Sequence, residues 1–111
     1  MALNKELVAA TAEPLILSIL SRKESYGYAL IKEVQRLSMG SLNWTEGMLY
    51  PVLHRLERRG VINSFWQNSD TGRKRKYYKI RKEGLAQLES LLKEWNCAHE
   101  ALIASRGGAR V

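Results

Sequence analysis

The densest cluster of ionisable side chains in this sequence is basic. Between residues 61 and 81, six lysines and arginines accompany a single acid, Asp70, so this stretch carries five of the seven net positive charges of the chain. The six are Arg73, Lys74, Arg75, Lys76, Lys79 and Arg81. Guanidinium and ammonium groups at this density bind phosphate oxygens through charge-assisted hydrogen bonds. The cluster therefore predicts a polyanionic partner, which is nucleic acid or, as the alternative, an anionic membrane surface.

Residues that could perform catalysis or bind a metal are sparse. His54 and His99 lie on different predicted elements, and neither has an acid or a nucleophile in a recognisable constellation beside it. Cys97 is the only cysteine, which excludes an internal disulfide and a thiolate cluster within one chain. We expect Cys97 to be a buried apolar side chain. The sequence predicts no enzymatic activity, no metal site and no cofactor.

The basic cluster lies on a predicted β-hairpin. Residues 62–66 and 76–80 have strand character, and residues 68–72 form a turn in which Gly72 permits a tight reversal. The charges of Arg73 to Lys76 then lie at the tip, where they contact phosphate or, in the simpler interpretation, only discourage edge-to-edge strand pairing. We expect Trp66 to be buried beneath the hairpin.

A helix is predicted directly before the hairpin. Thr45 is a suitable N-cap, and Gly60 ends the apolar pattern. Between them, four apolar residues follow the spacing i, i+3, i+4 and i+7 of one helical face. These residues, which we expect in the core, are Leu49, Val52, Leu53 and Leu56.

The opposite face of this helix is basic, aromatic or small. Pro51 lies within it and removes a hydrogen bond to the carbonyl of Gly47, at a cost of about 3 kcal/mol in an ordinary helix. We therefore expect a bend near Gly47, or a helix that begins only at Pro51. A helix of this kind fits the major groove of B-form DNA, while the hairpin contacts the backbone. The predicted DNA-contacting residues are Thr45, Gly47, Met48, Tyr50, Pro51, His54, Arg55, Arg58, Arg73, Lys74, Arg75 and Lys76.

Two further helical segments precede this pair of elements. Residues 3–20 form two helices separated at Pro14 or one kinked helix, and residues 26–37 form the positioning helix of a helix-turn-helix. The predicted fold is mainly α with a small β-hairpin (α+β), a winged helix-turn-helix over residues 1–81.

The C-terminal region predicts a homodimer. Leu85, Leu88, Leu92, Trp95, His99 and Leu102 are spaced 3, 4, 3, 4 and 3 residues apart. This heptad pattern is typical of a helix that packs lengthwise on another helix, and a second copy of the same helix is the economical partner. We expect residues 82–104 to be the dimerisation helix, with Leu3 and Leu7 joining the interface and residues 105–111 forming a disordered tail.

No membrane segment is expected. The uncharged apolar run from Pro14 to Ser21 is far shorter than the roughly 20 residues of a membrane span. The amino terminus carries Glu6 and Glu13 rather than a signal-peptide pattern. We therefore expect a cytoplasmic protein.

Three motifs together resemble the PadR-type transcriptional regulators. They are YGYALIK at residues 26–32, MLYPVLHRLE at 48–57 and GRKRKYY at 72–78, in the order of the family. The resemblance spans residues 12–103. The short C-terminal region is similar to the subfamily that has a single dimerisation helix. It departs from the family at Met48, where many relatives have threonine, so a base contact at that position is not carried over.

The resemblance implies a regulator that responds to a small molecule. In multidrug-binding members a tryptophan on the dimerisation helix lines a flat pore between subunits, and Trp95 occupies the matching position. This implies a repressor released by an aromatic or cationic hydrophobic effector bound near Leu88, Leu92, Trp95 and His99. Alternatively, Trp95 is plain interface core, and the protein is a constitutive or architectural DNA-binding protein. The resemblance implies two recognition helices on a pseudo-palindromic operator in double-stranded DNA.

Overall fold

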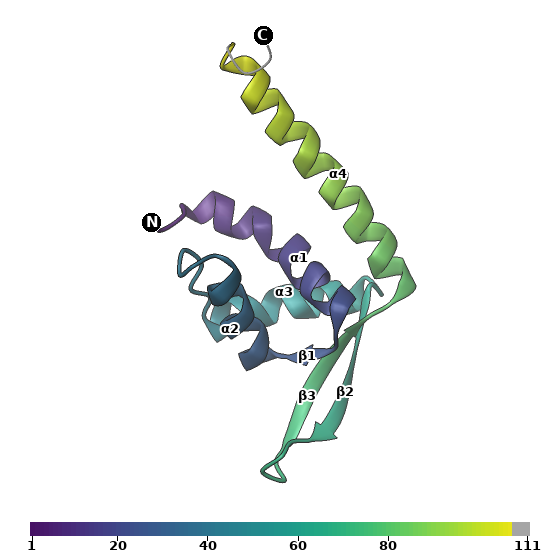
Figure 1. Ribbon diagram of the computed structural model, residues 1–111. Coiled ribbons are helices and arrows are strands. Elements are labelled where there is room, and N and C mark those ends of the chain that lie inside the picture. Colours follow the sequence, from purple (N-terminus) through teal and green to yellow (C-terminus); the bar gives the residue numbers. More distant parts are fainter. Residues whose placement is uncertain (108–111) are drawn as a thin grey trace.

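The described part of the chain, residues 1–107 of a computed structural model, contains four helices and one three-stranded sheet (Figure 1). In chain order these are α1 (Lys5–Arg22), β1 (Ser25–Tyr26), α2 (Gly27–Leu37), α3 (Glu46–Arg58), β2 (Ile62–Asn68), β3 (Lys74–Ile80) and α4 (Lys82–Ser105). The predicted winged helix fold is confirmed. None of the helices in residues 1–107 is both long and apolar enough to cross a membrane.

Helix α1 is one continuous helix with Pro14 inside it, so the alternative of two separate helices is wrong. The side chain of Asn4 caps its first turn by accepting a 2.9 Å hydrogen bond from the backbone N–H of Leu7. Pro14 and the residues that follow it are largely buried. Apolar burial along this second half anchors α1 to the remainder of the domain.

The core forms where α1, α2, α3 and the base of the hairpin meet. Leu17 of α1, Leu30 of α2, Leu53 of α3 and Ile62 of β2 are all fully buried. The four residues predicted to form the core face of α3 are each at most 6% exposed, so that prediction is confirmed. This packing fixes which face of α3 remains outside.

The sheet has the strand order β1-β3-β2 and is antiparallel throughout. The hairpin extends two residues farther on each strand than expected, because the register continues from Ile62–Ile80 to the polar pair Asn68–Lys74. The two-residue strand β1 pairs Tyr26 with Tyr77 and was not predicted. The hairpin projects away from the helices (Figure 1).

Helix α4 begins against the base of the hairpin and then extends away from the helical domain (Figure 1). Leu88 is buried in the core of its own chain, whereas Cys97 is exposed. The expectation of a buried Cys97 is wrong for the single chain, because this part of α4 has left the domain. Of the expected tail, Ser105 still belongs to α4, and residues 108–111 lie outside the described residues.

Candidate nucleic-acid interface

The exposed face of α3 combines small, proline and basic residues. The helix begins at Glu46, and the hydroxyl of Thr45 accepts a 3.2 Å hydrogen bond from the backbone N–H of Met48. A helix start at Pro51 is therefore wrong. Thr45, Gly47, Pro51, His54 and Arg58 are all exposed. They form a surface whose only ionisable groups are an imidazole and a guanidinium.

Two of the predicted contact residues lie instead on the flank of α3 that faces α1. Arg55 is 3.7 Å from the carboxylate of Glu13 in α1, and Met48 lines a groove between the two helices. Arg55 remains about half exposed, at 49%. It therefore lies at the edge of the α3 surface rather than at its centre.

Tyr50 lies on the opposite flank of α3, where α2 begins. A Cβ placed on Gly27, the first residue of α2, would come within 2.3 Å of the Tyr50 hydroxyl oxygen. Any larger residue at position 27 would therefore force the Tyr50 side chain to shift. The pair sets the spacing between α2 and α3 beside the base of the wing, which we define as β2, β3 and their turn.

The tip of the wing is a tight, self-bonded turn. The backbone N–H of Ser69 donates a 2.7 Å hydrogen bond to the carbonyl of Arg73, and the N–H of Gly72 donates a 2.9 Å bond to the carbonyl of Ser69. Gly72 has φ = +84°, a conformation that glycine adopts without strain. Arg73 and Lys74 are exposed immediately after this turn, so both can reach a phosphate.

The next two wing cations are held by aromatic rings. The guanidinium of Arg75 lies 4.3 Å from the ring centre of Tyr26, and the ammonium of Lys76 lies 5.8 Å from the ring centre of Tyr78. Both are half-buried. Cation–π contacts of this kind orient a charge without neutralising it, so Arg75 and Lys76 keep their charge for an anion.

A groove of about 750 Å³ separates the wing from the start of α2 and α3. All four tip cations line it, together with aromatic residues and a single acid, Glu46. Its lining residues are Tyr26, Gly27, Tyr28, Glu46, Tyr50, Trp66, Thr71, Arg73, Lys74, Arg75 and Lys76. The wing forms one wall of this groove, and α3 reaches it only with Glu46 and Tyr50, so His54 and Arg58 lie outside it.

The prediction that Trp66 is buried beneath the hairpin is wrong. Trp66 is 65% exposed rather than buried beneath the wing. Trp66 shares a strand face with Ile62, which is fully buried, but the hairpin has passed beyond the helices by the time it reaches Trp66. The indole is one of the lining side chains of the 750 Å³ groove.

The wing is attached to α3 near its base. The hydroxyl of Ser64 in β2 donates a hydrogen bond to the carboxylate of Glu57 in α3. Tyr78 of β3 is only 1% exposed, and burial raises its pKa to about 12, with smaller contributions from Tyr50 and Glu57. Its hydroxyl is therefore neutral near pH 7. These contacts fix the angle between the wing and α3.

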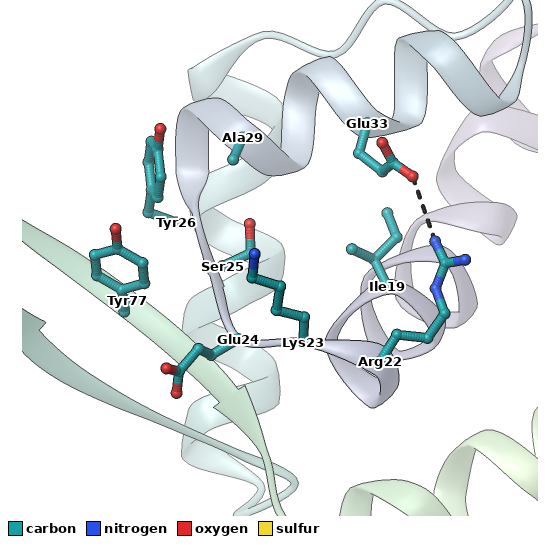
Figure 2. Close-up of a pocket in the computed structure, with 9 residues that line it drawn as sticks. All are labelled: Ile19, Arg22, Lys23, Glu24, Ser25, Tyr26, Ala29, Glu33 and Tyr77. Carbon is teal, nitrogen blue, oxygen red and sulfur yellow. Dashed lines mark hydrogen bonds and ion pairs between the residues drawn. The ribbon is translucent and has the colours of Figure 1, made fainter. Parts of the chain in front are cut away.

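A second hollow, of about 560 Å³, lies beside β1 and contains none of the predicted DNA-contacting residues (Figure 2). Across it, Arg22 of α1 bonds to Glu33 of α2 at 3.3 Å. The hydrogen bond from Arg36 lowers the pKa of Glu33, and the charges of Arg36 and Arg22 add to this effect. Glu33 thus serves as a fixed anion that joins α1 to α2.

The residues predicted for dimerisation fall into two groups. Leu88 is buried within its own chain, and Trp95 is half-buried beside α1. Leu85, Leu92 and Leu102 are 48%, 44% and 66% exposed, and Leu7 is 36% exposed. His99 is exposed and Leu3 is half-buried.

Leu92 and Trp95 face α1 across a crevice of about 180 Å³ that is also lined by Thr11, Pro14, Leu15 and Ser18. The described chain therefore leaves an apolar stripe of α4 uncovered.

The fold and this surface define the class of protein, a winged-helix DNA-binding regulator. Residues 16–90 match the family described as the transcriptional regulator PadR-like family. The chain belongs to this family, whose members are DNA-binding regulators of transcription rather than enzymes. The match runs from α1 through the wing into α4.

Relatives and solved structures agree with this assignment. An uncharacterized protein of Lysinibacillus sphaericus is 34% identical over 92 residues, which is 83% of this chain and 84% of that protein. The transcriptional regulator YqjI of Escherichia coli is 42% identical over 48 residues, which is 43% of this chain but only 23% of YqjI.

Among solved structures, the PadR-like transcriptional regulator of Bacillus cereus has a TM-score of 0.81 at 31% identity, covering 94% of this chain and 99% of its own. A PadR family transcription regulator of Clostridium difficile has a TM-score of 0.76 at 34% identity, covering 87% and 99%. The whole arrangement, including α4, is therefore similar to that of known family members.

Proposed function

We propose that this protein is a homodimeric, sequence-specific transcriptional repressor that acts in the cytoplasm. The observation that carries the proposal is the common groove of α3 and the wing, in which four cations and one acid face the same space. An α3 placed in the major groove brings these cations to the flanking phosphates. The exposed side chains of His54 and Arg58 would then face base edges.

The uncovered stripe of α4 supports the dimer. Leu85, Leu92 and Leu102 lie on a helix that extends away from its own domain, and burying them against a second α4 removes apolar surface from water. A two-fold dimer would present its two α3 helices to successive major grooves, about 34 Å apart. The operator is therefore pseudo-palindromic.

An effector is proposed at the crevice beside Trp95. The indole is half-buried and faces α1 together with Leu92, so a second chain placed here would enclose a flat apolar space. A planar aromatic ligand that binds one helix arrangement better than another shifts the spacing of the two α3 helices. Proflavine, titrated without DNA, is a suitable probe. Its binding is expected to disappear in Trp95→Ala, and unchanged affinity would refute the site.

The test of DNA recognition is a mobility shift with the protein's own upstream promoter. At near-physiological salt, the promoter should bind at least about 10³-fold more tightly than scrambled DNA of equal length. Replacement of His54 and Arg58 by alanine should remove most of this preference while the wing retains non-specific binding. Equal binding of wild-type protein to both duplexes, and to operators selected from random DNA, would favour an architectural role instead.

A further inference from the structure

A separate groove of about 400 Å³ lies between the first half of α1 and α3. Six of its lining residues are apolar, and the only charged ones are two cations. They are Leu3, Val8, Ala9, Ala12, Met48 and Val52, with Lys5 and Arg55. The lining contains no aromatic ring and no acid, which distinguishes it from the groove beside the wing.

Arg55 has hydrogen-bond donors that its neighbours leave free. Glu13 is already occupied, because Arg59 donates two hydrogen bonds to its carboxylate, at 2.9 and 3.2 Å. The Nη2 atom of Arg55 is 3.7 Å from the same carboxylate, which is beyond hydrogen-bond distance. Lys5 forms no ion pair among residues 1–107. Two cations beside an apolar surface are thus available to an anion.

We propose that this groove binds an aliphatic carboxylate of the medium-chain fatty acid class. The alkyl chain would lie along the apolar lining, beside Leu3, Val8 and the small exposed side chain of Ala9. The flexible thioether of Met48 adapts to such a chain. The carboxylate would accept two parallel hydrogen bonds from the planar guanidinium of Arg55, in a bidentate arrangement. The positive charge of Lys5 would stabilise it further.

Binding at this groove would weaken DNA binding. Arg55 belongs to α3, so a carboxylate bound to its guanidinium neutralises one positive charge at the edge of the proposed DNA surface. The attraction of Arg55 to the nearby phosphates is lost. This consequence rests on the proposed function, whereas binding of the fatty acid itself does not.

The test is isothermal titration calorimetry of the full chain with decanoate, below the concentration at which decanoate forms micelles and without DNA. Saturable binding of one decanoate per chain is expected. Arg55→Gln should weaken it by about tenfold or more, because a charge-assisted hydrogen bond is lost. Ala9→Phe, at an exposed position that lines the groove, should abolish it. Circular dichroism confirms that each variant is folded.

Matched controls separate this site from the others. Arg58→Gln, on the same helix but outside the groove, and Trp95→Ala, in the α1–α4 crevice, should bind decanoate like the wild type. Decyltrimethylammonium, which has the same chain with a positive head, and acetate, which lacks the chain, should not saturate the protein.

Several outcomes overturn the proposal. These are the absence of saturable binding, unchanged affinity in Ala9→Phe, or loss of affinity in Trp95→Ala instead. If decanoate does not bind and sedimentation shows that Ala9→Phe alters the oligomeric state, the groove is an interface between copies. A mobility shift without decanoate tests DNA binding independently, so failure of the fatty-acid site and failure of the proposed function are distinguishable.

Discussion

Replacing Arg73 and Lys74 together by glutamine is expected to lower the salt dependence of DNA binding. Both side chains are exposed directly after the turn of the wing and line its groove. Neither has an ion-pair partner within residues 1–107, so each can neutralise one phosphate. The substitution keeps the length and polarity of the side chains and removes two charges.

The magnitude follows from counterion release. Each lost phosphate contact reduces the slope of log affinity against log salt by about 0.9, so two contacts reduce it by roughly 1.8 for each bound wing. A fourfold rise in salt would then cost the wild type about tenfold more affinity per wing than it costs the variant. A dimer with both wings engaged shows twice this change in slope.

The assay is fluorescence anisotropy of a labelled operator duplex at four or more salt concentrations. Lys79→Gln is the matched control, because Lys79 is exposed on the same strand but does not line the groove. It should change the slope by much less. If the double variant keeps the wild-type slope, or if Lys79→Gln lowers the slope equally, the wing does not contact phosphate as we describe.

Three further predictions concern stability and assembly. Gly84→Ala should destabilise the fold by about 1–3 kcal/mol in chemical denaturation, since a Cβ there would lie 2.2 Å from the backbone oxygen of Val61; Ser90→Ala, at an exposed position of the same helix, is its control. The pKa of Tyr78 is raised to about 12 in the folded protein, compared with about 10 in the unfolded chain. Its contribution to the free energy of unfolding is therefore full below about pH 10. This contribution falls by about 3 kcal/mol as the pH rises toward 12. Tyr78→Phe should remove this fall in the unfolding free energy, and an unchanged pH profile would contradict the assignment. Leu102→Glu, at a side chain that is 66% exposed, should shift the protein toward monomers in sedimentation velocity without unfolding it.

Local patterns predicted α3 and the position of the hairpin well. The spacing of Leu49, Val52, Leu53 and Leu56 fixed the buried face of α3, because helical periodicity is a local property. The hairpin was predicted too short, since its outer residues, such as Gln67 and Lys74, are polar and pair only through the backbone. Strand β1 has just two residues and exists only because β3 offers it a partner.

The features that the sequence did not predict depend on contacts between segments that lie far apart in the chain. Arg55 lies beside Glu13 of α1, and no spacing rule links residues so far apart. Trp66 and Cys97 were expected to be buried from their residue types, but both lie where an element extends beyond the domain. The groove that carries the fatty-acid proposal likewise needs α1 and α3 to be placed side by side.

The most direct test of the central claim, that α3 and the wing form a sequence-specific DNA surface, is selection from a pool of random duplexes. The wild type should enrich a pseudo-palindrome whose half-sites are one helical turn apart. The variant in which His54 and Arg58 are replaced by alanine should enrich none, although it still binds DNA. Enrichment of the same sequence by this variant, or of no sequence by the wild type, would contradict the account.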